Sequence, residues 1–423
     1  MREPGPRRWG SALLAAVLGL TGPAVGVVGV AAPAYAAGCP GGSTPAADAV
    51  ADVPWPQRRY GLDRLAGIAD GTGIKVAVID SGVDPRHPQM AGNVVLQGFD
   101  GPEFAGDGPA HGQLDCAGHG TAVASIIAAR PIGGVGFRGI APRAQIIPIR
   151  VSEKQQLDGP AVGRVGGYPS LAEGVREAVR RGARVINLSL TAQTDHPLVR
   201  AQIANAAANG VVLVAAAGNH YEQGNPPSYP AMYPHVIGVG SIDSVGVRAP
   251  SSQVGSYVDL VAPGVGVLAA VPQRGHRPHD GTSFAAPFVA GTVALMLQYQ
   301  PELTPDQVEA GLRATADPAP GGPNSPEYGA GVVNPYRAVT QRPAGPARQV
   351  APVPPRMTDR QRAEELRSAA RRQRALALAG VVAALGALIL LGASAVPRGA
   401  RRRWRPGLRR PVPPASQPLL GDP

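Results

Sequence analysis

Short apolar runs rich in β-branched residues alternate along the chain with stretches whose apolar residues recur at helical spacing. The first run, Lys75–Ile79, reads KVAVI and ends directly before Asp80. An apolar run of this length is typical of a strand buried on both faces of a parallel sheet. Further strands are predicted at Val94–Leu96, Ile146–Val151, Val185–Leu190, Val211–Ala216 and Val236–Ser241.

Helical patterns fall between several of these strands. They are predicted at Thr121–Ala129, Ser170–Arg181 and Val199–Asn209. Alternation of strands and helices predicts an α/β fold, with a mainly parallel central sheet covered by helices on both faces. Functional residues of such sheets gather beyond the carboxyl ends of the strands, which is where Asp80 lies.

The N-terminus has the pattern of an export signal. Three arginines precede an apolar run from Ser11 to Val30, and Ala34 and Ala36 are small residues at the positions that a signal peptidase reads. The pattern predicts a signal peptide over residues 1–36 with cleavage after Ala36. A retained anchor, or a lipid attached to Cys39, are less favoured alternatives.

A second apolar segment near the other end predicts a membrane helix. Ala375–Val396 contains 22 residues without a charge, which as a helix would span roughly 33 Å, enough for a hydrocarbon core. A buried core helix is the weaker alternative, because the run has no polar face. The segments around it are an N-terminal extension (37–59), a globular domain (60–340), a Pro- and Arg-rich linker and stalk (341–374) and a basic tail (397–423).

The formal net charge of +11 raises the question of nucleic-acid binding. Residues 37–342 carry 22 basic and 24 acidic residues, whereas residues 343–423 carry 15 arginines and four acids. The positive charge therefore flanks the predicted membrane helix, where topology explains it better than nucleic acid does. With an exported middle region, the basic tail would be cytoplasmic and the protein a single-pass protein of the cell membrane.

The chain contains two cysteines, Cys39 in the N-terminal extension and Cys116 three residues before His119. Outside the membrane two cysteines most often pair, so we expect a Cys39–Cys116 disulfide that holds the extension near His119. Free or intermolecular thiols are the alternative. A catalytic role for Cys116 is not favoured, because a better nucleophile is present.

Three polar residues stand at the ends of predicted elements. Asp80 follows the first strand, His119 lies between glycines at the start of a helix, and Ser283 opens a long apolar helix. Taken alone, Ser283 would be interpreted as a helix cap. The chain order Asp, His, Ser, however, is the order of the subtilisin triad.

The local sequences carry the same signal. The segments VAVIDSGVD around Asp80, GHGTAVAS around His119 and GTSFAAPFVAG around Ser283 occur together with AAAGN, which ends at Asn219. From about Tyr60 to Val339 the chain resembles the subtilisin-like serine proteases. The resemblance implies a subtilisin-like three-layer α/β fold and peptide-bond hydrolysis, with no cofactor.

The resemblance also implies a role for each matching residue. Ser283 would be the nucleophile, His119 the general base, and Asp80 the carboxylate that orients His119. The side-chain amide of Asn219 would stabilise the oxyanion. A substrate strand would pair with Ser189, Leu190 and Thr191, beside a pocket walled by Ala216, Ala217 and Gly218.

Some features depart from the common subtilisin pattern. The extension is too short for a folding propeptide, and Arg130–Gly136 lacks the oxygen ligands that calcium prefers, so no metal is predicted. The loops Gly98–Ala117 and Ser152–Pro169 resemble insertions that shape access to the site. His220 would either influence the pocket or be a solvated loop residue. Three further residues near the motifs are expected at the surface: Asp84, His87 and His111.

The order of segments resembles a narrower group, the mycosins, which are membrane-bound proteases of type VII secretion systems. This resemblance implies an endopeptidase that makes limited cuts in exported proteins, with the membrane-embedded secretion components as partners. Two alternatives stay open. The domain could serve mainly as a scaffold of the secretion complex, or it could be a general degradative protease of the cell surface.

Overall fold

The computed structural model describes residues 39, 44–95, 97–105, 107, 111–153 and 164–341, together with 373–375, 379, 380 and 386. The chain divides into two compact units, Met1–Pro343 and Ala344–Pro423, and the folded domain belongs to the first. The predicted signal peptide and basic tail lie outside the described residues, as do most of the linker and of the predicted membrane helix; Gln373–Ala375 are helical.

A seven-stranded parallel sheet forms the centre of the domain, in the order β2-β3-β1-β4-β5-β6-β7. A separate antiparallel hairpin pairs β8 with β9. The strands are β1 (Lys75–Asp80), β2 (Phe99–Asp100), β3 (Gln145–Arg150), β4 (Val185–Leu188), β5 (Val212–Ala216), β6 (Val236–Ile242), β7 (Leu260–Pro263), β8 (Val267–Ala270) and β9 (His276–His279).

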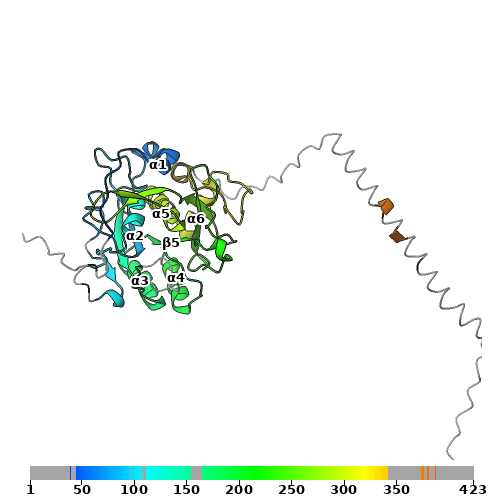
Figure 1. The fold of residues 1–423 in the computed structure, drawn as a ribbon, viewed down its shortest axis with the longest axis horizontal. Helices are drawn as coiled ribbons and strands as arrows, with labels where there is room; N and C mark the ends of the chain where they lie inside the picture. Colours follow the sequence, from blue (N-terminus) through cyan, green and yellow to red (C-terminus); the bar gives the residue numbers. More distant parts are fainter. Residues whose placement is uncertain are drawn as a thin grey trace, which may run out of the picture. The chain divides into compact units, whose positions relative to one another are not determined.

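Helices cover both faces of the sheet (Figure 1). On one face lie α2 (His119–Ala128) and α5 (Thr282–Tyr299), with α6 (Pro305–Thr315) and α7 (Pro335–Thr340) beside them. The other face is covered by α3 (Tyr168–Arg180) and α4 (Pro197–Ala208). The predicted three-layer α/β fold is therefore confirmed, and each of the three predicted helices begins two residues earlier than its apolar pattern suggested.

The core explains why the strands appear as continuous apolar runs. Along β1, Val76 and Val78 pack with α2 and α5, whereas Ala77 and Ile79 pack with α3. Successive side chains of a strand point to opposite faces, so both sets must be apolar when both faces are covered. Among the described residues, α5 is the helix long and apolar enough to cross a membrane, and it is almost wholly buried inside this domain.

The predicted strand at Val94–Leu96 is wrong. Val94 makes an isolated bridge to Ile146, and the strand at this edge of the sheet is β2 instead. Between them the chain passes very close to β3, where a Cβ on Gly98 would lie 2.3 Å from the carbonyl oxygen of Pro148. A glycine is thus needed for the chain to cross β3 at this point, and regular pairing begins only beyond it.

The N-terminal extension is fixed to the domain by the Cys39–Cys116 disulfide, which confirms the predicted pairing. Thr44 donates its N–H to the carbonyl of Cys116 (3.1 Å) and its hydroxyl to the carbonyl of Ala117 (2.7 Å). Further along, α1 (Trp55–Tyr60) starts the compact domain. The extension therefore lies against the two residues that lead directly into the start of α2.

Candidate active site

The four residues that the sequence motifs singled out for catalysis lie at the carboxyl ends of the parallel strands. Asp80 is the last residue of β1, and His119 is the first residue of α2. Ser283 is the second residue of α5, and Asn219 follows three residues after β5. Loops at this edge of a parallel sheet bring together residues that are far apart in sequence.

Asp80 and His119 form a buried pair. The Nδ1 atom of His119 lies 2.7 and 2.9 Å from the two carboxylate oxygens of Asp80, and both side chains are less than a tenth exposed. The backbone N–H of Ser81 also donates to Asp80. The glycine after His119 permits this approach, because a Cβ at Gly120 would lie 2.1 Å from the carbonyl oxygen of Gly82.

The surroundings of His119 tune its proton affinity. Burial by itself lowers the pKa of an imidazole, since the charged form loses its hydration. The charge and hydrogen bond of Asp80, together with the charge of Asp115, outweigh burial, so the pKa of His119 lies above its ordinary 6.5. This arrangement stabilises the imidazolium that forms when a histidine accepts a proton during catalysis.

Ser283 does not cap its helix. The N-cap of α5 is Gly281, and the Ser283 hydroxyl bonds to no N–H of this helix end. The Ser283 hydroxyl donates to the carbonyl of Ser189 (3.3 Å), whose own hydroxyl donates back to the Ser283 carbonyl (2.8 Å). The structural alternative for Ser283, a helix cap, is therefore excluded.

The second ring nitrogen of His119 is unpartnered in the part of the chain that the structure describes. Its buried Nε2 atom has no hydrogen-bond partner among the described residues. The ring of Phe284, the residue after Ser283, packs edge-on against the His119 ring at 5.2 Å. Bringing Ser283 and His119 into contact requires the Ser283 hydroxyl to turn away from Ser189, and catalytic hydrogen bonds often tighten only when substrate binds.

Asn219 is held by the residue before Ser283. Its Oδ1 atom accepts hydrogen bonds from the Thr282 N–H (2.9 Å) and the Thr282 hydroxyl (3.1 Å). The Nδ2 donor is thereby directed away from Thr282 and remains available to an oxyanion. The sequence motifs singled out Asn219 but not Thr282, because the contact joins residues 63 positions apart.

The residues expected to bind substrate lie at the ends of β4 and β5. Ser189 and Leu190 follow β4 and are buried, Thr191 is partly exposed, and Ala192 bridges to Tyr229. Ala216 ends β5, and it is buried together with Ala217 and Gly218, which has a φ of +103°. Gly218 is needed there, because a Cβ would lie 2.1 Å from the Gln253 side-chain oxygen.

Two of the three residues expected at the surface are buried. Asp84 accepts hydrogen bonds from the Arg86 side chain and from the N–H of Gln273, 189 residues away. His87 packs edge-on against His276. The local sequence could not show that the distant segment Gln273–His276 packs over both residues. His111 is exposed, as expected, and His220 is half-buried.

A carboxylate that the motifs did not reveal lies behind the Asp80–His119 pair. Asp115 is 3% exposed and accepts hydrogen bonds from the Ser81 hydroxyl (2.8 Å), the Gly118 N–H (2.7 Å) and the Thr121 N–H (2.8 Å). Burial raises the pKa of Asp115 to about 6, against the opposing effect of these hydrogen bonds. Its position in a loop of irregular sequence gave no periodic signal.

The two predicted insertion loops are joined by a cluster of charges. Arg150 is fully buried and contacts Asp107 (2.7 Å) and Glu153 (2.8 Å), while Arg164 contacts the same two carboxylates. Both guanidinium groups lie over the ring of Phe104. Asp107 belongs to the first loop, and Glu153 and Arg164 belong to the second.

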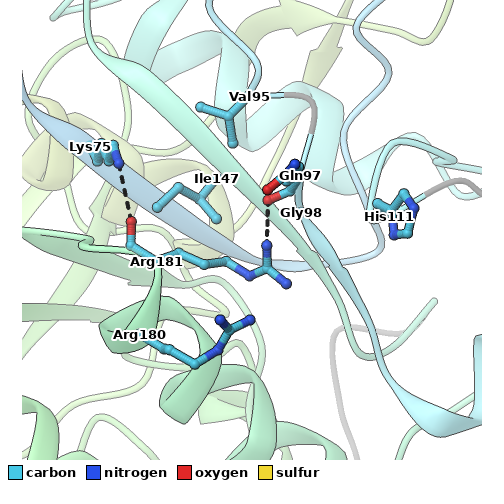
Figure 2. Close-up of a pocket in the computed structure, with 8 residues that line it drawn as sticks. All are labelled: Lys75, Val95, Gln97, Gly98, His111, Ile147, Arg180 and Arg181. Carbon is cyan, nitrogen blue, oxygen red and sulfur yellow. Dashed lines mark hydrogen bonds between the residues drawn. The ribbon is translucent and has the colours of Figure 1, made fainter.

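A surface pocket is lined by residues other than Asp80, His119 and Ser283. Its volume is about 790 Å³, and it is lined by Lys75, Arg180, Arg181 and neighbours (Figure 2). Lys75 begins β1, so this pocket lies toward the end of the strand opposite to Asp80. Among the described residues, no group of three His, Cys, Asp or Glu side chains could hold a metal ion.

The fold and the site together define a class. A buried carboxylate–imidazole pair, a serine at the start of a buried helix, and an asparagine amide at the ends of parallel strands are the components of a serine peptidase with the subtilisin chain order. Residues 71–331 match the model of the Subtilase family, peptidase S8. The chain therefore belongs to this family and is a subtilisin-type serine endopeptidase.

Curated relatives agree with this assignment. Subtilisin NAT of Bacillus subtilis subsp. natto is 37% identical over 65% of this chain and 69% of its own length. Thermitase of Thermoactinomyces vulgaris is 34% identical over 68% of this chain and 98% of its own length.

Solved structures add a narrower likeness. The MycP3 protease from the type VII (ESX-3) secretion system is 32% identical, with a TM-score of 0.59 over 71% of this chain and 91% of its own. MycP1 from Mycobacterium smegmatis is 30% identical, with a TM-score of 0.58 over 71% and 88%. Fervidolysin from Fervidobacterium pennivorans is 33% identical, with a TM-score of 0.61 over 69% and 46%. The chain is thus similar to mycosin proteases in fold and sequence.

Proposed function

We propose that Ser283, His119 and Asp80 are the catalytic triad of this endopeptidase and that Asn219 supplies the oxyanion donor. The observation that carries the proposal is the buried Asp80–His119 hydrogen bond, beside a serine that does not cap its own helix. A serine hydroxyl is a weak nucleophile at neutral pH and needs a base within reach.

The geometry supports an acyl-enzyme reaction. The Ser283 hydroxyl turns from Ser189 toward His119 Nε2, gives up its proton to that nitrogen, and its oxygen forms a bond to the substrate carbonyl carbon. Asn219 Nδ2 and the Ser283 N–H stabilise the resulting oxyanion. His119 then gives the proton to the amine nitrogen as the C–N bond breaks. Water repeats the sequence and releases Ser283.

Substrate would bind in extended form along the backbone of Ser189–Thr191. Since Ser189, Leu190 and Gly218 are buried, they would contact substrate through main-chain groups, whereas the partly exposed Thr191 could also offer its side chain. Main-chain pairing fixes the scissile bond without selecting a sequence. Selection would then come from the loops Gly98–Ala117 and Ser152–Pro169.

The triad is tested by replacing Ser283 with Ala in the full-length chain and measuring cleavage of short chromogenic peptides. Ser125→Ala is the matched control, because Ser125 is also buried but bonds to the N–H of Ala270 in β8. We expect Ser283→Ala to abolish cleavage and Ser125→Ala to retain it. Residual cleavage by Ser283→Ala at the parent rate would refute the triad.

We further propose that the protein is a membrane-anchored protease of a type VII secretion system, where it makes limited cuts in exported proteins. Support comes from the apolar segment Ala375–Val396, the export signal over residues 1–36 and the likeness to MycP3 and MycP1. The protease domain would face the outside, and residues 397–423 would lie in the cytoplasm.

Comparison of secreted proteins from three strains tests this setting. The strains carry the parent gene, Ser283→Ala, or a deletion. Processed fragments that disappear in both altered strains identify exported substrates. Secretion that survives Ser283→Ala but fails on deletion assigns the main role to a scaffold. Unchanged secretion in both strains, with broad digestion of unfolded casein, would contradict the proposal and favour a degradative enzyme.

A further inference from the structure

Asp115 is a buried carboxylate that the proposed mechanism does not use. Its three hydrogen bonds reach two separate elements. One donor is the hydroxyl of Ser81, the residue after Asp80 at the end of β1. The other two are the N–H groups of Gly118 and Thr121, which lie on either side of His119 in the first turn of α2.

These contacts join the residues adjacent to Asp80 with the residues adjacent to His119. The Ser81 oxygen that donates to Asp115 also accepts the N–H of Gly120 (2.9 Å). Ser81 and Asp115 therefore tie the end of β1 to three N–H groups in the single turn of backbone around His119, those of Gly118, Gly120 and Thr121. A carboxylate at a helix N-terminus is also favourably placed toward the unpaired N–H groups there.

We propose that Asp115 is a positioning residue for catalysis: by joining Ser81 to the first turn of α2, it holds the His119 ring against Asp80. This inference rests on the triad assignment above. Asp115 bonds to Ser81, Gly118 and Thr121 and, among the described residues, makes no hydrogen bond to Ser283. Its effect on the reaction passes through the placement and the charge of His119.

The charge of Asp115 has a consequence that simple packing would lack. Among the described residues, the ionisable groups that face it are Asp80 at the end of β1 and His119 on α2. Its negative charge raises the pKa of His119, and the nearby charge of Asp80 raises the pKa of Asp115 itself. Loss of the Asp115 charge should therefore lower the pKa of His119, so His119 stays neutral at lower pH.

The main test is Asp115→Asn in the full-length protein. In Asp115, Oδ1 accepts from Ser81 and Gly118, and Oδ2 accepts from Thr121. In asparagine one of these oxygens becomes an NH₂ group, which faces an N–H or O–H donor, and two donors cannot pair. We expect kcat to fall by about 10²-fold, the loss typical of a misplacement near 1 Å, with KM changed less than about twofold. The acid limb of kcat/KM should move to lower pH.

Asp259→Asn is the matched control. Asp259 is also a mostly buried carboxylate that accepts a backbone N–H, from Gly238, and burial raises its pKa to about 6 as well. It lies just before β7, the edge strand, which is three strands away from β4 and the Ser189 that contacts Ser283. We expect this variant to change Tm while kcat and the acid limb stay at the parent values.

Two outcomes would overturn the inference. One is an Asp115→Asn protein whose kcat and acid limb equal those of the parent. The other is a pair of variants, Asp115→Asn and Asp259→Asn, with equal kinetic losses, which would indicate a general effect of a lost carboxylate.

If Asp115→Asn does not fold, Ser81→Ala tests the inference instead. It keeps the carboxylate but removes its link to β1, and should lower kcat about tenfold; an unchanged kcat refutes the inference.

Failure of the triad is distinguished by Ser283→Ala in the same assay. If that variant still cleaves peptide, the triad assignment is wrong whatever Asp115 does. If it is inactive while Asp115→Asn matches the parent, the triad stands and the positioning role of Asp115 is refuted.

Discussion

Two polar clusters lie close to each other at the carboxyl ends of β1 and β3, where Asp80 and Arg150 are register partners. The proposed catalytic cluster, called the catalytic cluster below, consists of Asp80, Ser81, Asp115 and His119. The loop cluster consists of Asp107, Arg150, Glu153 and Arg164. Both are hydrogen-bonded. The catalytic cluster is buried, whereas the loop cluster has a buried Arg150 surrounded by partly exposed partners. Their charges are arranged in opposite ways.

In the loop cluster every charge has a partner of opposite sign. Hydrogen bonds from Arg164, and then from Arg150, hold the pKa of Asp107 below its ordinary value. In the catalytic cluster two carboxylates and one histidine lie together: burial raises the pKa of Asp115, helped by the charge of Asp80, and the pKa of His119 is raised because Asp80 and Asp115 outweigh its burial. Compensated charges hold loops in place, whereas uncompensated ones leave groups that titrate near neutral pH and can move protons.

The largest expected effect is confined to the catalytic site. Ser283→Ala should lower kcat by about 10⁶-fold, the loss measured for the corresponding serine of subtilisin. Tm should change little, because the serine caps no helix. The measurement is peptide cleavage in parallel with thermal unfolding. A fall in Tm large enough to explain the loss would instead make Ser283 a structural residue.

Asn219→Ala comes next. Removing the side-chain donor should reduce kcat by about 10²–10³-fold, the range known for this donor in subtilisin, with KM nearly unchanged. The oxyanion forms only in the transition state, so ground-state binding should be spared. A rise in KM at constant kcat would show that Asn219 binds substrate and not the oxyanion.

The loop cluster should respond in stability. Arg150→Met leaves Asp107 and Glu153 with fewer partners and should cost about 3 kcal/mol of unfolding free energy, as expected when one partner of a buried ion pair is lost. Cleavage of short peptides should stay within a few-fold of the parent. The control is Arg143→Met, because Arg143 is exposed and its ion pair with Asp70 is long, at 3.8 Å. A kcat loss equal to that of Asp115→Asn would remove the distinction between the clusters.

The smallest expected effect is a difference between the pH at which activity is lost and the pH at which the stabilisation from Asp107 is lost. His119 must be neutral to act as base, and its pKa is raised, so the acid limb of kcat/KM should lie above pH 6.5. Asp107 has a lowered pKa in the folded state, so its stabilisation is present above the unfolded value of 3.8 and is lost as pH falls through the folded one. Activity should thus fall at a higher pH than this part of the stability; coincident transitions in rate and unfolding would contradict this.

Local sequence was sufficient for part of this picture. The strand before Asp80 and the helices after His119 and Ser283 are encoded by apolar runs with glycines at close approaches, so the three-layer fold could be predicted. The disulfide followed from the number of cysteines. The strands and helices depend on residues that are near each other in the chain, whereas the disulfide joins residues 77 positions apart and could be predicted because the chain has two cysteines.

Features that depend on distant contacts could not be predicted. Asp84 is covered by Gln273 from the turn between β8 and β9, which made an apparent surface residue a buried one. Thr282 and Asp115 act through bonds to Asn219 and Ser81, and no periodic pattern records such pairings. The predicted strand at Val94–Leu96 failed because the close passage of Gly98 over β3 is a tertiary constraint.

The central claim is that Ser283 is the nucleophile and His119 its base. The most direct measurement is peptide mapping by mass spectrometry after the full-length protein reacts with diisopropyl fluorophosphate, which activated serines attack much faster than ordinary serines do. We predict one adduct per chain, on Ser283, and its loss in His119→Ala. An adduct on another serine, or a Ser283 that reacts equally well without His119, would contradict the account.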